Sequence, residues 1–135
     1  MVAIHPRAEL TLPFAEAGKP RYGQLALSVD DDETRARQLA RELFRFSTAG
    51  WKVQSELPNP VNFEAATANV REEDVAKEIS CGIDPDRHLE AIQQWLAAGF
   101  DRIAVVALGN LDRFFELWEQ DLRPRLDSLS TSATR

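Results

Sequence analysis

The sequence is poor in cysteine, lysine and long apolar runs, and each shortage excludes a class of protein. Its single cysteine, Cys81, cannot form a disulfide within the chain, which excludes a disulfide-stabilised scaffold and favours a cytoplasmic location. With only three lysines and a net charge of −6, the chain is not expected to bind nucleic acid. No apolar run approaches the roughly 18 residues of a membrane helix, and no signal peptide opens the chain, so we expect no membrane partner.

The chain also lacks the motifs that usually mark a catalytic or phosphate-binding site. It has no glycine-rich phosphate loop, and its two histidines, His5 and His88, do not stand at the spacing of zinc ligands. Cys81 has no CxxC partner, so we expect a buried, inert thiol at this position. The sequence therefore assigns no catalytic, cofactor-binding or metal-binding residue.

What the chain does have is the composition of one ordinary globular domain. It contains 135 residues, of which 44% are apolar and 28% are charged. A chain of this size buries about two-thirds of its surface on folding, which is enough for one core. We expect a single domain over residues 1–126, with a helical insertion at about residues 50–80, followed by a disordered polar tail over residues 127–135.

Hydrophobic periodicity predicts strands that alternate with helices. Strands are predicted over residues 22–29 and 102–108, and helices over 30–46, 62–69, 72–79, 85–98 and from 110 to a stop at Pro124. The strand over 102–108 is apolar on both faces, which is typical of a parallel sheet covered by helices. The fold class is therefore α/β, with crossover connections between parallel strands.

Two strands are too few for a stable parallel sheet, which normally has three or more. Ser80–Ile83 can add a short third strand. Either the first twenty residues hide another strand, or the chain is a piece of a larger sheet.

The acidic run Asp30–Glu33 follows one predicted strand and opens the next helix. Asp30 or Asp31 can cap that helix, whose dipole favours negative charge at this end. The same acids could hold Mg²⁺ or form part of a phosphoacceptor receiver-like signalling domain. A receiver also needs an aspartate and a lysine at the ends of later strands. The strand over 102–108 supplies neither, so the cap is the favoured interpretation.

Ligands of α/β proteins bind beyond the carboxyl ends of parallel strands. In this chain those positions hold Ser28, Asp30 and Asn110, which are therefore the candidates for the substrate side of a site. Asn110 is equally suited to cap the helix that follows it.

Three arginines lie four residues apart on the outer face of the helix over residues 30–46, and they are Arg37, Arg41 and Arg45. Such a row could bind an anion. We expect instead local pairing with acids of the same helix, such as Glu33 and Glu42.

Six segments, in their order and spacing, resemble the C-terminal part of the luciferase-like monooxygenase superfamily, nearest to oxidoreductases like coenzyme F420-dependent glucose-6-phosphate dehydrogenase. The segments are Gly18–Arg21, Glu56–Phe63, Arg71–Ala76, Asp84–His88, Ala98–Asp101 and Phe114–Trp118. The resemblance implies the C-terminal half of a (β/α)₈ TIM barrel, in which residues 22–29 are strand seven and residues 103–108 are strand eight. It also places the catalytic histidine and nearly all cofactor contacts of the family in the half that this chain does not contain.

The resemblance implies a parent enzyme that transfers hydride to or from F420 or FMN on a small-molecule substrate. Phosphate-binding basic residues of the glucose-6-phosphate branch correspond to Gln54 and Glu78, so no substrate residue is carried over. We expect the chain alone to be inactive and to bind neither cofactor tightly. The alternative from another class is a non-catalytic interaction remnant, and open strand edges predict self-association or a homodimer in either case.

Overall fold

Two parallel strands, β2 (Tyr22–Val29) and β4 (Arg102–Gly109), form the centre of the structure. They pair along their whole length, from Tyr22 opposite Arg102 to Val29 opposite Gly109. The computed structural model describes residues 2–3 and 5–132. Both strands match the ranges predicted from hydrophobic alternation to within one residue.

Two short strands complete the sheet on the other edge of β2. β1 (Val2–Ala3) pairs with the beginning of β2, and β3 (Ser80–Cys81) pairs with its end, both in parallel. The start of the chain thus does hide a strand, and the short third strand near residue 80 is also present. Within the described part of the chain, β4 pairs with β2 alone, so one edge of the sheet is open.

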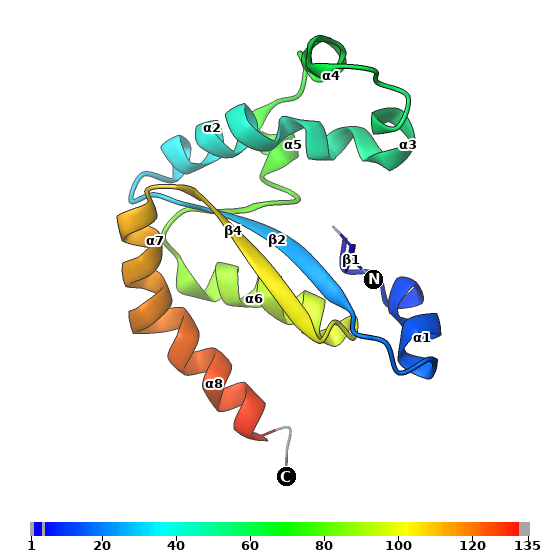
Figure 1. The fold of residues 1–135 in the computed structure, drawn as a ribbon. Helices are drawn as coiled ribbons and strands as arrows, with labels where there is room; N and C mark the ends of the chain where they lie inside the picture. The colour runs from blue at the N-terminus through cyan, green and yellow to red at the C-terminus, as the bar shows by residue number, and fades with distance from the viewer. Residues whose placement is uncertain (1, 4, 133–135) are drawn as a thin grey trace.

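Helices connect and cover these strands (Figure 1). They are α1 (Ala8–Glu16), α2 (Glu33–Phe44), η1 (Arg45–Ala49), α3 (Gly50–Gln54), α4 (Pro60–Ala66), α5 (Glu72–Val75), α6 (Pro85–Ala97), α7 (Leu111–Leu117), η2 (Trp118–Leu122) and α8 (Arg123–Ser132). α2 crosses the carboxyl ends of β2 and β4, while α6 runs along the sheet. Among these described helices, none combines the length and apolar character required to cross a membrane.

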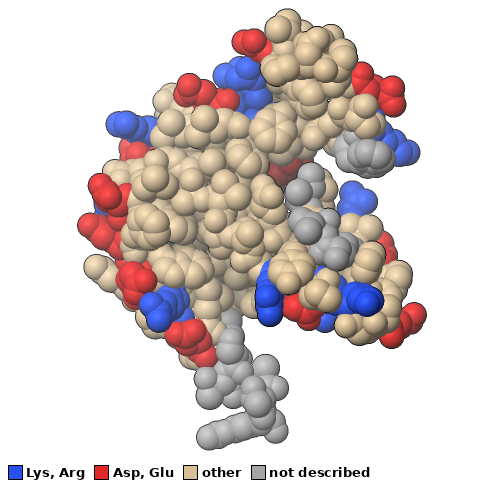
Figure 2. Space-filling model, viewed as in Figure 1, with Lys and Arg blue, Asp and Glu red and all other residues tan. Residues whose placement is uncertain are grey.

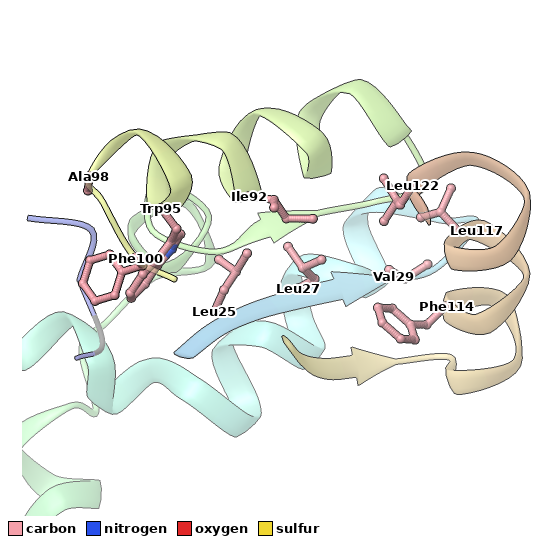
Figure 3. Close-up of a cluster of buried hydrophobic side chains, with 10 residues drawn as sticks. All are labelled: Leu25, Leu27, Val29, Ile92, Trp95, Ala98, Phe100, Phe114, Leu117 and Leu122. Carbon is pink, nitrogen blue, oxygen red and sulfur yellow. The ribbon is translucent and has the colours of Figure 1, made fainter. Parts of the chain in front are cut away.

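The two faces of β2 carry different cores because its side chains alternate between them. One face packs against α6, α7 and η2, and Figure 3 shows this cluster: Leu25, Leu27, Val29, Ile92, Trp95, Ala98, Phe100, Phe114, Leu117 and Leu122. The other face packs small side chains against α2 and the end of α5, in a cluster of Ala26, Ala36, Ala40, Val75, Ile79, Cys81 and Leu108. Alanine at these positions lets α2 approach the strands closely.

The prediction that β4 is buried on both faces is wrong for most of the strand. Only Leu108 is buried, Ala104 is exposed, and the other apolar residues are half-buried. The apolar pattern correctly indicates a parallel strand. Its burial is incomplete because β4 lies at the open edge of the sheet, where it pairs with no second strand among the described residues.

The C-terminal segment is helical where the sequence predicts a stop and a disordered tail. The helix passes through a wider π-helical turn, η2, and continues as α8 to Ser132, with Pro124 in the first turn of α8. The wider turn accommodates a proline ring that would otherwise clash with the carbonyl one turn earlier. The correction covers residues 127–132, whereas residues 133–135 of the predicted tail lie outside the described residues.

The arginine row on α2 holds the segment that follows it rather than pairing only within the helix. Arg37 Nε donates to Glu33 at 3.0 Å, as predicted. Arg41 Nε instead donates to the carbonyl of Val70 at 2.7 Å, and Arg45 Nε donates to the hydroxyl of Thr67 at 3.2 Å. The row therefore anchors the connection between α4 and α5 to α2.

Candidate functional site

The structure brings the three sequence candidates together at the carboxyl ends of β2 and β4. Ser28 and Asp30 lie at the end of β2, and the backbone N–H of Asn110 donates to the carbonyl of Val29 at 2.9 Å. This is the edge of the sheet at which parallel α/β proteins place ligands. The structure thus places the three residues at one edge of the sheet, and their role toward a substrate stays a prediction.

Each of the three side chains already has a partner within the fold. The fully buried Ser28 hydroxyl donates to the carbonyl of Ala36 at 2.7 Å, which ties β2 to α2. Asn110 caps α7, accepting from the N–H of Arg113 at 3.2 Å. Asp30 accepts from the N–H of Asp32 at 3.1 Å. The geometry therefore assigns all three a structural role.

The acidic run forms a helix N-terminus, but the capping residue is one that the sequence did not single out. Asp32, rather than Asp30 or Asp31, accepts from the N–H of Thr34 at 2.9 Å and caps α2. The cap falls there because the turn held by Asp30 extends the loop before the helix begins. No group of three or more possible metal-ligating side chains occurs among the described residues.

Arginines from distant parts of the chain neutralise the remaining acids. Arg113 of α7 donates to Asp31 from Nε at 3.0 Å and from Nη2 at 2.9 Å. Glu33 lies between Arg37 and Arg87, with Nη1 of Arg87 at 3.0 Å. Hydrogen bonds from Arg37 and then Arg87 hold the pKa of the Glu33 carboxyl below its usual value. Each acid of the run is therefore engaged, which removes the basis for a magnesium or receiver-like site.

His88 is a buried structural residue. Its Nε2 lies 2.9 Å from the carbonyl of Gly82, and its Nδ1 lies 2.8 Å from the hydroxyl of Ser80. A carbonyl only accepts, so Nε2 carries the proton and Nδ1 accepts from Ser80 in the neutral ring. Burial lowers the pKa of His88, which keeps the ring neutral while it joins α6 to β3.

This arrangement predicts that stability falls on mild acidification. Below about pH 6.5, His88 binds a proton in the unfolded chain but not in the native structure. Acid therefore stabilises the unfolded state relative to the native state. The free energy of unfolding should therefore decrease between about pH 7.5 and pH 5.5, with a slope of at most about 1.4 kcal/mol per pH unit. Urea unfolding of the native chain and of His88→Asn measures this, and the variant should be less stable at neutral pH with a flatter profile.

Two solvent-accessible carboxylates provide an internal reference for that experiment. Hydrogen bonds lower the pKa of Asp74, chiefly from Lys77, and that of Asp101, chiefly from Arg21, each to about 2. Their contribution is present above their unfolded values and is lost only as the pH falls below about 4. Equal slopes for native chain and variant near pH 6 would contradict the assignment of the mild-acid effect to His88.

Cys81 is buried, as predicted. Its thiol donates to the carbonyl of Ile79 at 3.2 Å, and burial raises its pKa to about 11. A thiol that stays protonated at neutral pH is a poor nucleophile. Its environment is therefore that of a core residue.

A cavity of about 320 Å³ opens beside the middle of β2, between α6 and the helices that follow α2. Its lining includes Gln24, Phe44, Phe46, Glu78 and Trp95. Among the polar members, Glu78 accepts from the hydroxyl of Ser47 at 3.2 Å. Sequence reasoning missed this cavity because its walls come from five separate segments.

The arrangement of parallel strands and covering helices defines part of an α/β barrel. Parallel strands alternate with covering helices, but only β2 and β4 have the full length of a barrel strand. At their carboxyl ends, Ser28 and Asn110 hydrogen-bond to backbone groups of α2 and α7, and Asp31 accepts from the side chain of Arg113. This is the architecture of a partial barrel, as the sequence predicts.

Comparison with known proteins identifies which barrel this part resembles, although no protein-family model matches the chain. The chain is 32% identical over 111 residues to the F420-dependent glucose-6-phosphate dehydrogenase of Rhodococcus hoagii (strain 103S). It is 30% identical over 132 residues to the enzyme of that name from Segniliparus rotundus. The matches cover 82% and 90% of this chain but only 33% and 39% of those proteins.

Solved structures agree on the fold. An F420-dependent secondary alcohol dehydrogenase, in complex with an F420–acetone adduct, superposes with a TM-score of 0.66 at 18% identity over 88% of this chain and 40% of its own. The coenzyme F420-dependent tetrahydromethanopterin reductase of Methanopyrus kandleri superposes with a TM-score of 0.63 at 22% identity, over 92% and 44%. The resemblance is confirmed: in sequence this chain is similar to part of F420-dependent glucose-6-phosphate dehydrogenases, and in fold it is similar to part of the two solved structures.

Proposed function

We propose that this chain is the C-terminal part of an oxidoreductase that uses F420, or FMN in its place. In that enzyme it supplies barrel strands and part of the substrate-binding side at the carboxyl ends of the strands. In such an enzyme the cofactor supplies the hydride chemistry, and the protein binds and orients it. The sequence match carries the proposal, since about four fifths of the chain aligns with F420-dependent enzymes of which it spans about a third.

In this proposal, the described residues support a cofactor site that other parts of the barrel complete. At the carboxyl ends of β2 and β4, the acids lie beside arginines that they already neutralise, and Asn110 caps α7. Glu78 lines the cavity beside β2 with a negative charge, which does not suit a phosphorylated ligand. We therefore assign these residues a supporting role and derive no hydride-transfer step from them.

We predict that the isolated chain does not bind F420 or FMN tightly, because the groups facing the strand ends are internally paired. The test is a titration of the purified chain that follows cofactor fluorescence, with the full-length Rhodococcus hoagii relative as the positive control. The expected trace for this chain shows no saturation at low micromolar concentrations. Saturable binding there would overturn the proposed division of roles.

A second candidate function, a non-catalytic interaction module, is favoured by one observation. β4 pairs on one side only within the described residues, and an unpaired strand edge can bind another strand. This candidate needs no cofactor, so cofactor titration and a measurement of association separate the two.

A further inference from the structure

The open edge of β4 presents a defined set of unpaired backbone groups. The N–H of Arg102 donates to the carbonyl of Arg21 at 3.2 Å, and that of Asn110 donates to Val29 at 2.9 Å, so even-numbered residues face β2. Backbone direction alternates along a strand, so Ile103, Val105 and Ala107 direct their N–H and C=O groups away from β2. No other described strand pairs with β4 there.

The opposite edge of the sheet is protected, which makes β4 the place for association. β1 pairs with the beginning of β2 and β3 with its end, so another full-length strand cannot pair there without displacing them. Short strands of this kind are a common way to blunt an edge. On its open side, β4 pairs with no short strand of this kind in the described part of the chain.

Apolar side chains flank the open edge on both sides of the sheet. Ala104 is exposed on one face, and Ile103 and Val105 are only half-buried on the other. On α7, which follows β4 directly, Leu111 is 52% exposed and Phe115 is 59% exposed. Figure 2 shows a broad uncharged area over the middle of the molecule with charged side chains gathered around its margins.

We propose that the open edge of β4 binds a second copy of this chain, with the two β4 strands antiparallel about a two-fold axis perpendicular to the sheet. A two-fold axis in this direction reverses the strand and continues each sheet face onto the same face of the partner copy. The odd-numbered residues of each β4 then satisfy one another's backbone groups. This inference deepens the second candidate function and rests on it, because both use the open edge of β4; it requires no cofactor or substrate, so cofactor titration tests the first candidate separately.

The helix layer leaves room for this arrangement. α7 contacts both β2 and β4, so it lies over the seam between them rather than beyond the open edge. With strands about 4.8 Å apart, the two copies of α7 are offset sideways by about 10 Å, and antiparallel pairing places them at opposite ends of the paired strands. The two helices therefore do not collide, and the exposed Leu111 and Phe115 of each copy lie toward the beginning of β4 of the second copy.

Charge also favours a second copy in antiparallel orientation. Arg102, at the beginning of β4, forms no ion pair among the described residues, and its guanidinium lies 5.7 Å from the centre of the Tyr22 ring. Asp112, in the first turn of α7 beyond the other end of β4, is exposed and also forms no ion pair in the described part of the chain. Antiparallel pairing brings each Arg102 toward the Asp112 end of the partner copy.

Sedimentation equilibrium at tens of micromolar tests the proposal, and a dimer of the 15.2 kDa chain is the expected species. Val105→Pro should convert the dimer to a folded monomer, because the lost N–H points to the open edge and not to β2. Circular dichroism verifies that the variant folds. A native chain that is monomeric at this concentration, or one that forms open-ended oligomers, would overturn the proposal.

A charge exchange provides a second test that leaves the strand intact. Arg102→Glu should raise the dissociation constant of the dimer about tenfold or more, and adding Asp112→Arg to the same chain should restore most of the affinity. If the single and double variants bind equally, the antiparallel arrangement is wrong.

Crosslinking then distinguishes the orientation directly. Ala104→Cys lies near the two-fold axis, whereas Arg102→Cys places its two thiols about 20 Å apart in an antiparallel pair centred near Val105. A short bismaleimide should therefore link the first variant and not the second, with buried Cys81 as an unreactive background. Efficient linking at residue 102, or capture of a different protein by β4 in preference to a second copy, would contradict the inference.

Discussion

Replacing Gly109 by alanine is expected to remove most of the stability of the fold. Gly109 ends β4 with φ at +87°, a conformation that other residues rarely adopt. A Cβ at this position would lie 2.5 Å from the carbonyl oxygen of Val29, which is also the acceptor for the Asn110 N–H. Backbone strain and this clash together should cost at least about 3 kcal/mol, against the roughly 5–15 kcal/mol that stabilise a typical domain.

Gly18 is the matched control because it shares the conformation without the contact. Its φ is +62°, and a Cβ there would meet nothing within 4 Å. Gly18→Ala should therefore cost only about 1–2 kcal/mol, the penalty of the left-handed conformation itself. Urea unfolding of both variants measures the difference, and equal losses would show that the approach of Val29 to Gly109 does not constrain the fold.

The second large effect is expected at Trp95. This side chain is 3% exposed, packs edge-on against Phe100 with ring centroids 4.8 Å apart, and fills the space over Gly23 where a Cβ would otherwise stand. Trp95→Ala leaves a cavity where α6 meets the beginning of β2. The expected loss is about 3–5 kcal/mol, as for other large buried aromatic residues.

The neighbouring Leu96 provides the comparison for Trp95. It is on the same helix, one residue further along, and is 45% exposed. Leu96→Ala should therefore cost less than about 1 kcal/mol. Thermal or urea unfolding of both variants measures the two losses in free energy of unfolding. Similar losses would contradict the conclusion that α6 packs against the sheet through the face that carries Trp95.

Much of the fold could be predicted because local sequence patterns indicate where strands and helices begin and end. Alternating apolar residues place β2 correctly, and Asp84 followed by Pro85 marks the start of α6. Gly99 follows the end of that helix with φ at +85°, as expected for a residue just past a helix C-terminus. The segments resembling F420-dependent enzymes likewise lie in the sequence itself, and the comparisons confirm that resemblance.

The candidate site was predictable only in part. Parallel strands require their carboxyl ends to meet, so the convergence of Ser28, Asp30 and Asn110 followed from the strand assignment. Their partners did not follow, because Arg113 reaches Asp31 across 82 positions of sequence. The sequence around a charged side chain does not indicate which acid it will pair with after folding.

The sequence by itself determined the class of fold, the direction of the two long strands and the kind of enzyme of which this chain resembles a part. Only the tertiary structure decided which strand lies at an edge of the sheet. Apolar residues on both faces of β4 indicate that burial of these faces is favourable, but they do not indicate how many strands pair with β4. The tertiary structure also decided that the last helix passes Pro124. A proline blocks an ordinary α-helical turn, and the wider turn over Trp118–Leu122 is stabilised by the packing of Leu122 into the core.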